Sequence, residues 1–454
     1  MTLISGGSRG LALLVACLMV AAGTKAAGAA GSLPVVHHRK LANGLEVLVA
    51  PRHHAPLLSF QVWYRVGSRD EAIGQSGISH LVEHLMFQGS PNYPTGQYDA
   101  LVERNGGSNN AFTTEDYTAY YVDLPSDKLQ LAASLEADRM RGLLMPEGKF
   151  GSELSVVKEE RRWRTENDPF GMMWEMLGAT SYVQHPYRWP VVGWMADLDR
   201  MTRAKAMAHY RRHYHPDQAV AVVVGDVSPD KVFRIVDQTF GKLPRGPGVD
   251  RVVPAEPPQR GERRTTLLRP VQAPAVMLAY HTGARRDDDH HALVLAERVL
   301  SAGRSSRLQR DLVDGRKLAQ EVGASAMAGL DPGLFLVYGV PMPGHSAAEL
   351  ERELQAALDR LASEPITEKE RQKAYDQAKA AHLLGMEKNH DLGIALGTAA
   401  MLGNWRWALD EVRDLAAVSP ARLQQVAANT FRIANRSVIV LEPEPSDAPP
   451  KDDE

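Results

Sequence analysis

The chain has 454 residues, of which 44% are hydrophobic and 24% are charged, and its formal net charge is −3. This length suits two to four domains at roughly 150 residues each, and the composition excludes a disordered chain and a long coiled coil. The charge balance argues against a nucleic-acid-binding protein, and the single cysteine, Cys17, excludes an intrachain disulfide, so histidines and carboxylates would have to hold any metal ion.

The chain begins with a segment that has the features of an export signal. Arg9 precedes an apolar run from Leu11 to Ala22, and Ala27-Gly28-Ala29 fits a signal-peptidase cleavage site. We therefore predict a signal peptide over residues 1–30 and export, which in a Gram-negative bacterium means the periplasm. The alternatives are an uncleaved membrane anchor and a lipoprotein processed at Cys17.

Residues 31–242 predict a first domain of mixed α and β structure. Alternating or continuous apolar runs bounded by turn signals predict strands, and 3.6-residue periodicity predicts helices. The predicted strands are 45–49, 58–66, 117–124 and 219–224, and the predicted helices are 78–87, 127–144 and 153–160. Both element types are therefore expected in this domain.

The second half of the chain repeats this plan at an offset of about 216 residues. Tyr64 and Gly67 recur as Tyr280 and Gly283, and Pro125 recurs at the same offset. Such regular spacing predicts two homologous units that arose by duplication of one domain.

Composition predicts where these units end. Residues 243–264 are rich in proline, glycine and arginine, which is typical of an exposed linker. The second unit is then expected over 265–441. Residues 442–454 carry proline and charged residues without an apolar period, which predicts a disordered tail.

The predicted helix over 78–87 carries the sequence His80-Leu81-Val82-Glu83-His84. Residues four apart lie on one face of a helix, so His80 and His84 can ligate one zinc ion. Glu83 lies near the same face and could take a proton from a zinc-bound water, which would then attack a peptide carbonyl.

The second unit has apolar residues where the first has this polar cluster. At the repeat offset, Ala296, Val299 and Leu300 correspond to the two histidines and the glutamate between them. A cluster with a purely structural duty would be expected to survive in part in the copy. Its loss favours a functional site in the first unit.

A catalytic zinc ion usually has three protein ligands and one open position, so a third ligand is needed. The predicted helix over 153–160 is acidic, and Glu153 and Glu160 share one of its faces. Helical spacing leaves Glu159 and Glu160 as alternatives for the third ligand.

These residues resemble the pitrilysin and insulinase family of zinc peptidases, whose motif is the inverted form His-x-x-Glu-His. The resemblance runs over nearly the whole chain after the signal segment. The segments that carry it are Gly67-Ser68-Arg69-Asp70-Glu71, the His80–His84 motif, Gly106-Gly107-Ser108-Asn109-Asn110-Ala111-Phe112-Thr113 and Tyr214-His215-Pro216.

The resemblance implies a role for each candidate site residue. Glu160 stands at the family's third zinc ligand, and Glu153 would support the site, with one zinc ion per chain and Glu83 as the catalytic base. The segment Asn110-Ala111-Phe112 would lie on an edge strand that binds the main chain of an extended peptide by β-augmentation.

The resemblance also implies the architecture and the assembly. The fold would be of the α+β class, with each unit a mostly antiparallel sheet packed with helices. The two-unit length is similar to that of mitochondrial processing peptidase and its bacterial relatives, which work as dimers. Members that complete the site from a second unit use an arginine and a tyrosine, where this chain has Val313 and Gln320. We therefore expect a heterodimer with a related subunit that supplies this pair. The alternative is a homodimer in which Arg316 substitutes.

Together these features predict a zinc metalloendopeptidase that hydrolyses peptides or unfolded segments. The alternatives are a non-catalytic scaffold or partner subunit of a peptidase complex, and a zinc- or peptide-binding module without activity. Glu83 distinguishes a peptidase from a structural zinc site, because a closed structural site needs a fourth ligand and has no use for a base.

Overall fold

The computed structural model describes residues 33–251 and 253–445. The predicted signal peptide and most of the predicted tail lie outside the described residues. Within the described ranges, we find no helix of the length and apolar character that a membrane span requires.

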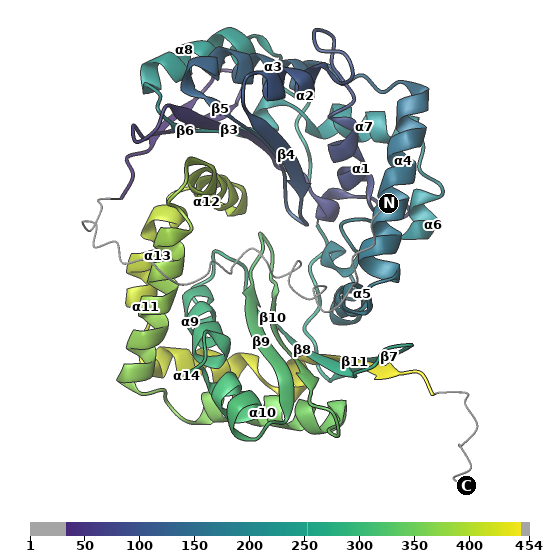
Figure 1. Cartoon of the computed structure of the whole chain (residues 1–454), viewed down its shortest axis with the longest axis vertical. Helices are drawn as coiled ribbons and strands as arrows, with labels where there is room; N and C mark the ends of the chain where they lie inside the picture. The colour runs from purple at the N-terminus through teal and green to yellow at the C-terminus, as the bar shows by residue number, and fades with distance from the viewer. Residues whose placement is uncertain (1–32, 252, 446–454) are drawn as a thin grey trace, which may run out of the picture. The chain divides into compact units, whose positions relative to one another are not determined.

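The first half of the described chain forms one six-stranded sheet with helices packed on it, among them α3, which lies over β3 and β5 (Figure 1). Its strands are β1 (His37–Lys40), β2 (Glu46–Pro51), β3 (Leu57–Tyr64), β4 (Ser108–Thr113), β5 (Thr118–Pro125) and β6 (Ala219–Gly225). Its α-helices are α1 (Ile78–Leu85), α2 (Gln97–Arg104), α3 (Leu129–Arg141), α4 (Glu147–Arg161), α5 (Pro169–Ser181), α6 (Met195–Leu198), α7 (Arg203–His213) and α8 (Pro229–Thr239). The strands and helices predicted from periodicity are confirmed, with boundaries shifted by a few residues.

The order of strands in this sheet is β1-β2-β6-β3-β5-β4, and β2 and β6 form a parallel pair while the other pairs are antiparallel. Every residue of β6 is buried, as expected for a central strand of small and β-branched residues that is covered on both faces. Strand β4 forms one edge of the sheet.

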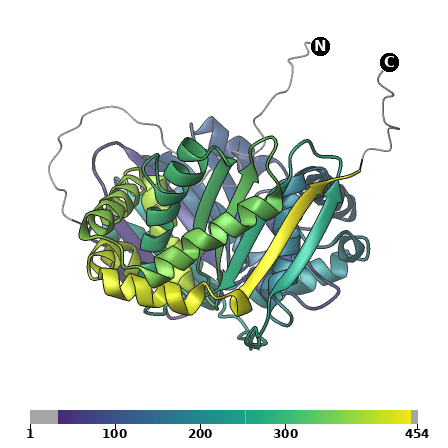
Figure 2. The same cartoon turned by 90° about the horizontal axis from the view of Figure 1, so that it is seen from below.

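The second half forms a five-stranded sheet, with helix α10 lying across its strands (Figure 2). Its strands are β7 (Arg263–Arg269), β8 (Ala275–His281), β9 (Ala319–Met327), β10 (Leu334–Pro341) and β11 (Arg436–Pro443). Its helices are α9 (His290–Ser301), the π-helical segment η8 (Gln309–Gly315), α10 (Ala347–Ser363), α11 (Glu368–Leu384), α12 (Asn389–Leu402), α13 (Trp407–Ala416) and α14 (Pro420–Thr430).

The two sheets have the same topology, which confirms the predicted architecture of two homologous units. The second sheet has the order β7-β11-β8-β10-β9, and this matches β2-β6-β3-β5-β4 position by position. The first pair is parallel in both sheets, and the remaining pairs are antiparallel. The predicted mostly antiparallel sheets are thus observed in both halves.

The predicted linker and the second unit meet at a slightly different place in the structure. Strand β7 begins at Arg263, inside the linker predicted over 243–264, and β11 extends to Pro443, beyond the predicted end at 441. Strand β7 is an edge strand whose residues alternate between exposed and partly buried positions. Its first two residues are arginines, so its sequence resembles a solvated linker until pairing with β11 is known.

Helix α12 belongs to the second half of the chain but packs on the first sheet, against β3 and β6. Its fit depends on a close approach, because a Cβ atom at Gly397 would lie 2.0 Å from the ring of Trp63. The side-chain amide of Gln61 also donates a hydrogen bond of 3.0 Å to the carbonyl of His390. These contacts join the two units through a common apolar core.

A buried ionic cluster joins the units at a second place. The guanidinium of Arg69 lies 2.7 Å from Asp331 and 3.3 Å from Asp116. Asp116 also accepts hydrogen bonds from the hydroxyl of Tyr187, at 2.6 Å, and from the amide of Leu330, at 2.9 Å. The turn between β9 and β10 is thereby bound to the segment that leads into α1.

Candidate metal centre

Helix α1 begins at a tightly packed turn. Its N-cap, Gly77, has a φ of 86°, and a side chain there would come within 2.5 Å of the carbonyl oxygen of Val192, so the position requires glycine. The buried carboxyl group of Glu71 accepts hydrogen bonds from the amides of Gly77 and Ser79, each 2.8 Å long. These bonds satisfy amides that the helix leaves free and fix the position of its first turn.

The three side chains predicted as metal ligands converge between α1 and α4, which lie side by side in Figure 1. Glu160 Oε2 lies 3.4 Å from His84 Nε2 and 3.7 Å from His80 Nε2. All three candidate donor atoms lie within 4.8 Å of one another. Ligand atoms about 2.0–2.1 Å from a tetrahedral zinc ion are about 3.4 Å apart. The three residues therefore fit one zinc ion.

The structure separates the two glutamates that helical spacing left as alternatives. The side chain of Glu159 is 72% exposed and pairs with Arg162, whereas that of Glu160 is 16% exposed and faces the histidines. Arg164 Nη1 lies 2.6 Å from Glu160 Oε1. This contact leaves the other oxygen, Oε2, directed at the two imidazoles.

Glu153 lies behind one of the histidines. Its Oε2 is 3.4 Å from His84 Nδ1, and its Oε1 accepts a hydrogen bond of 2.8 Å from the side-chain amide of Gln88. A carboxylate behind a ligating histidine fixes the tautomer that leaves Nε2 free for the metal. His80 differs, because its buried Nδ1 has no hydrogen-bond partner within the described residues.

Glu83 lies between the two histidines on α1 and is 8% exposed. Its Oε2 accepts a hydrogen bond from the hydroxyl of Thr113, the last residue of β4. Burial raises the pKa of Glu83 to about 7, although the bond from Thr113 opposes this rise. A carboxyl group that titrates near neutrality can both accept and return a proton at the pH of most cells.

Two of the three candidate ligands have protonation states that suit metal binding. Burial and the neighbouring charge of His84 lower the pKa of His80 to about 4. Burial acts in the opposite direction on Glu160, but hydrogen bonding with His84 and the charges of His80 and Arg164 outweigh it and lower its pKa to about 2. At neutral pH, His80 is therefore neutral and Glu160 is ionised, and these are the forms that bind metals. Burial lowers the pKa of His84, but hydrogen bonding with Glu160 and the charge of Glu83 outweigh it and raise the pKa, so a metal ion would have to displace a proton from this histidine.

Family models and a named relative identify the family to which this chain belongs. The family model described as insulinase (peptidase family M16) matches residues 47–193, and the model described as peptidase M16 inactive domain matches residues 200–378. A relative from Helicobacter pylori named zinc protease PqqE is 32% identical over 417 residues, which are 90% of this chain and 94% of the relative. The chain belongs to the M16 peptidase family. The resemblance to the insulinase family predicted from the motifs is thus confirmed.

Solved structures show the same fold as this M16 protein. The crystal structure of a protease from Helicobacter pylori has a TM-score of 0.85 and 32% identity, and the match covers 90% of this chain and all of that chain (100%). The periplasmic protease PqqL from Escherichia coli has a TM-score of 0.74 at 17% identity. That match covers 90% of this chain but 47% of the PqqL chain. The likeness to PqqL concerns the fold alone.

The second unit of this M16 chain, part of which matches the inactive-domain model, has apolar residues in place of the cluster. Its counterpart of α1 is α9, where the residues at the repeat offset are buried and apolar: Ala296, Val299 and Leu300. Its counterpart of α4 is α11, which packs against α9 with the small side chains of Ala374 and Ala378. Small residues let these two helices approach where their counterparts in the first unit hold polar side chains.

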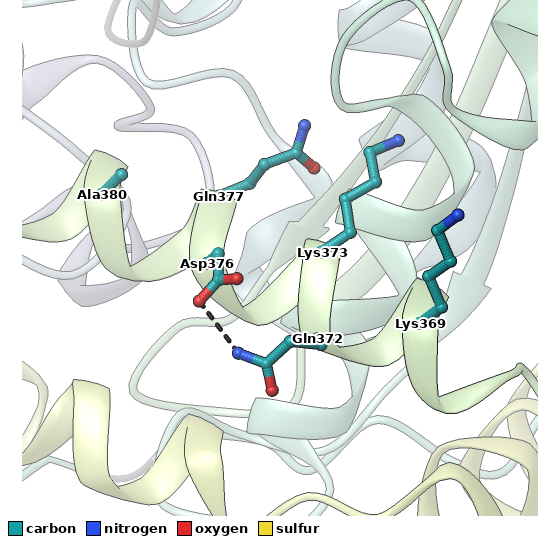
Figure 3. Close-up of a pocket in the computed structure, with 6 residues that line it drawn as sticks. All are labelled: Lys369, Gln372, Lys373, Asp376, Gln377 and Ala380. Atoms are coloured by element: carbon teal, nitrogen blue, oxygen red, sulfur yellow. Dashed lines mark hydrogen bonds between the residues drawn. The ribbon is translucent and has the colours of Figure 1, made fainter.

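Several polar residues of α11 line a shallow pocket (Figure 3). At the repeat offset, Lys369 takes the place of Glu153 and Asp376 that of Glu160. Asp376 accepts a hydrogen bond of 3.0 Å from Gln372 on this exposed face, so its carboxylate is directed away from α9. The described residues of this second pair of helices therefore provide no equivalent of the metal centre.

The predicted substrate strand, Asn110-Ala111-Phe112, lies in β4 at the edge of the first sheet. Ala111 packs against the core on the α1 side, and the ring of Phe112 packs on the other face against Trp63, with ring centroids 5.6 Å apart. The phenylalanine side chain is thus partly buried by packing, and a peptide could pair only with the main-chain groups of this edge strand. Substrate binding by these residues stays a prediction.

The residues that replace the family's arginine and tyrosine are engaged in local contacts. The side-chain amide of Gln320 donates to the carbonyl of Pro341 at 3.0 Å, and Val313 packs against the core of the second unit. The guanidinium of Arg316 lies 2.9 Å from Glu353 and also pairs with an aspartate of η8. These ion pairs argue against Arg316 as a free substitute.

Sequence reasoning assigned no role to Thr113, Gln88 or Arg164. Each of them touches a site residue through a contact that the structure creates. Only Arg164 has a local signal, because it stands four residues after Glu160, in the π-helical segment η4 (Arg162–Glu166) that continues α4.

Proposed function

We propose that this chain is a zinc metalloendopeptidase that hydrolyses peptides or unfolded polypeptide segments. The observation that carries the proposal is the convergence of two histidines and Glu160 at one point, with the buried Glu83 on the same helix as the histidines. A structural metal site would need a fourth ligand in place of this carboxyl group. The name of the Helicobacter pylori relative, zinc protease PqqE, supports the same function.

His80, His84 and Glu160 are the residues that would hold the zinc ion, one per chain. A bound zinc ion supplies Lewis acidity, which polarises a peptide carbonyl and acidifies water. Glu83 removes a proton from the attacking water as the new carbon–oxygen bond forms. It then returns the proton to the departing amine as the carbon–nitrogen bond breaks. Glu153 keeps His84 in the orientation that ligation requires.

The edge strand β4 supports an extended peptide as the substrate. An edge strand has main-chain groups that are free to pair with a further strand, and such pairing accepts many sequences provided that the peptide is unfolded. Thr113, the last residue of β4, contacts Glu83, so a peptide bound along β4 would pass close to the base.

The experiment that tests this function compares Glu83→Gln with the parent, using fluorescein-labelled casein as an unfolded substrate. Glu83→Gln should keep about one zinc ion per chain by elemental analysis and lose about 10²–10⁴-fold in cleavage rate, because only the base is removed. The matched control is Glu159→Gln, the same change at an exposed site, which should cleave at the parental rate. Equal rates in Glu83→Gln and the parent would refute the proposal, and His84→Ala should lose the zinc ion.

We also propose that a related subunit completes the active site and supplies the arginine and tyrosine that this chain lacks. The local contacts of Gln320 and Arg316 support this heterodimer. A homodimer is the alternative. Purification of the tagged chain from its source cell should yield a second M16 chain, and full activity of the pure single chain would refute the heterodimer.

The third proposal concerns location. The predicted signal over residues 1–30 supports export to the periplasm. Fractionation of the source cell, followed by N-terminal sequencing, should find the protein in the periplasmic fraction with a new N-terminus near residue 30. A cytoplasmic protein that retains its first residues would refute export.

A further inference from the structure

One contact joins the predicted substrate strand to the predicted base. The hydroxyl of Thr113 donates to Glu83 Oε2, and among the described residues it is the one side chain that hydrogen-bonds this carboxyl group. We propose that Thr113 is a positioning residue for Glu83, which fixes the base in a set orientation beside the strand with which a peptide substrate would pair. The inference rests on the proposed peptidase function and adds a residue to its mechanism.

Thr113 is held in place by its own hairpin. It pairs with Thr118 across β4 and β5, and their hydroxyl oxygens lie 3.4 Å apart. The hydroxyl of Thr118 donates to the carbonyl of Val66 at 2.9 Å. In the turn that follows, the hydroxyl of Thr114 exchanges hydrogen bonds with the main chain of Tyr117, both 3.1 Å long. The backbone of Thr113 is therefore fixed without any help from Glu83.

The same turn is attached to the segment that precedes α1. The amide of Ser68 donates to the carbonyl of Thr114 at 3.1 Å, and the amide of Arg69 donates to the carbonyl of Glu115 at 2.9 Å. A few residues later, Glu71 holds the first turn of α1 through its carboxyl oxygens. The threonine and the helix that carries Glu83 thus share one rigid connection, so their separation is set by the fold.

The direction of the hydrogen bond determines what it does to Glu83. A threonine hydroxyl that donates to Oε2 occupies one oxygen and holds the carboxyl plane, so the other oxygen, Oε1, remains to accept a proton from water. A carboxyl group that is free to rotate would spend much of its time in unproductive orientations, and catalysis requires that the reacting atoms stay aligned.

The position of Thr113 on an edge strand connects this bond to the substrate. Side chains alternate along a strand, so Ala111 and Thr113 share the face that packs toward α1, and Ala111 contacts the core on that side. A peptide that pairs with the free edge of β4 uses the main chain of the strand, whereas the hydrogen bond to Glu83 uses the side chain of Thr113. Loss of the threonine hydroxyl should therefore affect turnover more than affinity.

The test uses the full chain, together with any partner that co-purifies, and the variants Thr113→Val and Thr113→Ser. Valine keeps the shape and removes the hydroxyl, whereas serine keeps the hydroxyl. With an internally quenched peptide copied from a casein fragment that the parent cleaves, Thr113→Val should lower kcat about 10- to 100-fold, the effect of losing one hydrogen bond to a charged group. KM should stay within about twofold and zinc at about one per chain, while Thr113→Ser should recover most of kcat. Thr266→Val, which removes an exposed hydroxyl from β7 in the second unit, is the control and should be unchanged.

Several results would overturn the inference. They are a parental kcat in Thr113→Val, a serine variant as slow as the valine variant, an effect confined to KM, and loss of zinc from Thr113→Val. A parent that binds zinc but cleaves nothing even together with its co-purified partner would refute the peptidase function instead. In that case the cobalt-substituted protein still decides the role of Thr113. Its visible spectrum should change in Thr113→Val and return in Thr113→Ser, and an unchanged spectrum in Thr113→Val would overturn the inference.

Discussion

Glu153 offers a quantitative test of how the metal centre is built, because it is predicted to act on the metal through His84 alone. The substitution Glu153→Gln keeps the size of the side chain and removes its charge. His84 Nδ1 then loses its anionic acceptor, and the tautomer that leaves Nε2 free for the metal is no longer favoured. Zinc should bind more weakly while its three ligands remain in place.

The structure sets the expected size of this effect. Loss of a partner behind a metal ligand typically weakens metal affinity about 10- to 100-fold, which is about 1.4–2.7 kcal/mol. The distance of 3.4 Å between His84 Nδ1 and Glu153 Oε2 is longer than an ideal hydrogen bond, and the two side chains are 21% and 17% exposed. We therefore expect a loss near the lower limit, about tenfold, at neutral pH.

The assay is competition for zinc against a chromophoric chelator, with Glu159→Gln as the matched control. Both substitutions remove one negative charge from α4, but the side chain of Glu159 is 72% exposed and pairs with a surface arginine. Its effect on zinc affinity should be less than about twofold, because exposed charges are screened by solvent. An equal loss in both variants would show that only net charge matters, and an unchanged affinity in Glu153→Gln would refute the role of Glu153 in orienting His84.

Two further predictions concern stability. Arg69→Met should lower the unfolding free energy, measured in urea, by about 3–5 kcal/mol, because it leaves Asp116 and Asp331 without their buried partner. A decrease below about 1 kcal/mol would mean that the cluster does not hold the two units together. Burial lowers the pKa of His209 to about 3 and that of His213 to about 2 in the folded chain. Below about pH 6.5 the unfolded state therefore binds protons that the folded state does not. The metal-free protein should lose stability as the pH falls. When the pH falls from about 7.5 to about 5.5, the unfolding free energy of His213→Gln should fall by about 1.4 kcal/mol less than that of the parent. Equal decreases in the two proteins would contradict the low pKa of His213.

The local parts of the site follow from the sequence because they depend on one helix. A spacing of four residues places His80 and His84 on the same face of any α-helix, and the apolar residues between them predict that helix. Repeat spacing likewise predicts two homologous units, since duplicated sequence folds into duplicated topology. Both expectations needed no knowledge of how distant segments meet.

The choice between Glu159 and Glu160 shows where such reasoning ends. Both residues stand near the same turn of a helix, and their order along the chain says nothing about which side of that helix α1 will cover. Only the packing of α4 against α1 turns Glu160 inward and leaves Glu159 in solvent. The start of β7 at Arg263 is similar, because pairing with β11 decides whether a polar segment is a strand or a linker.

What the sequence determined by itself is the chemistry available to this protein: the metal-binding motif on one helix, the acidic helix that follows, and a second unit without the motif. What only the tertiary structure decided is how these parts meet. The hydrogen bond from Thr113 to Glu83, the ionic cluster around Arg69 and the apolar packing of α9 against α11 all join segments far apart in the chain. Such contacts depend on the register and packing of whole elements, so periodicity and spacing within one segment carry no signal for them.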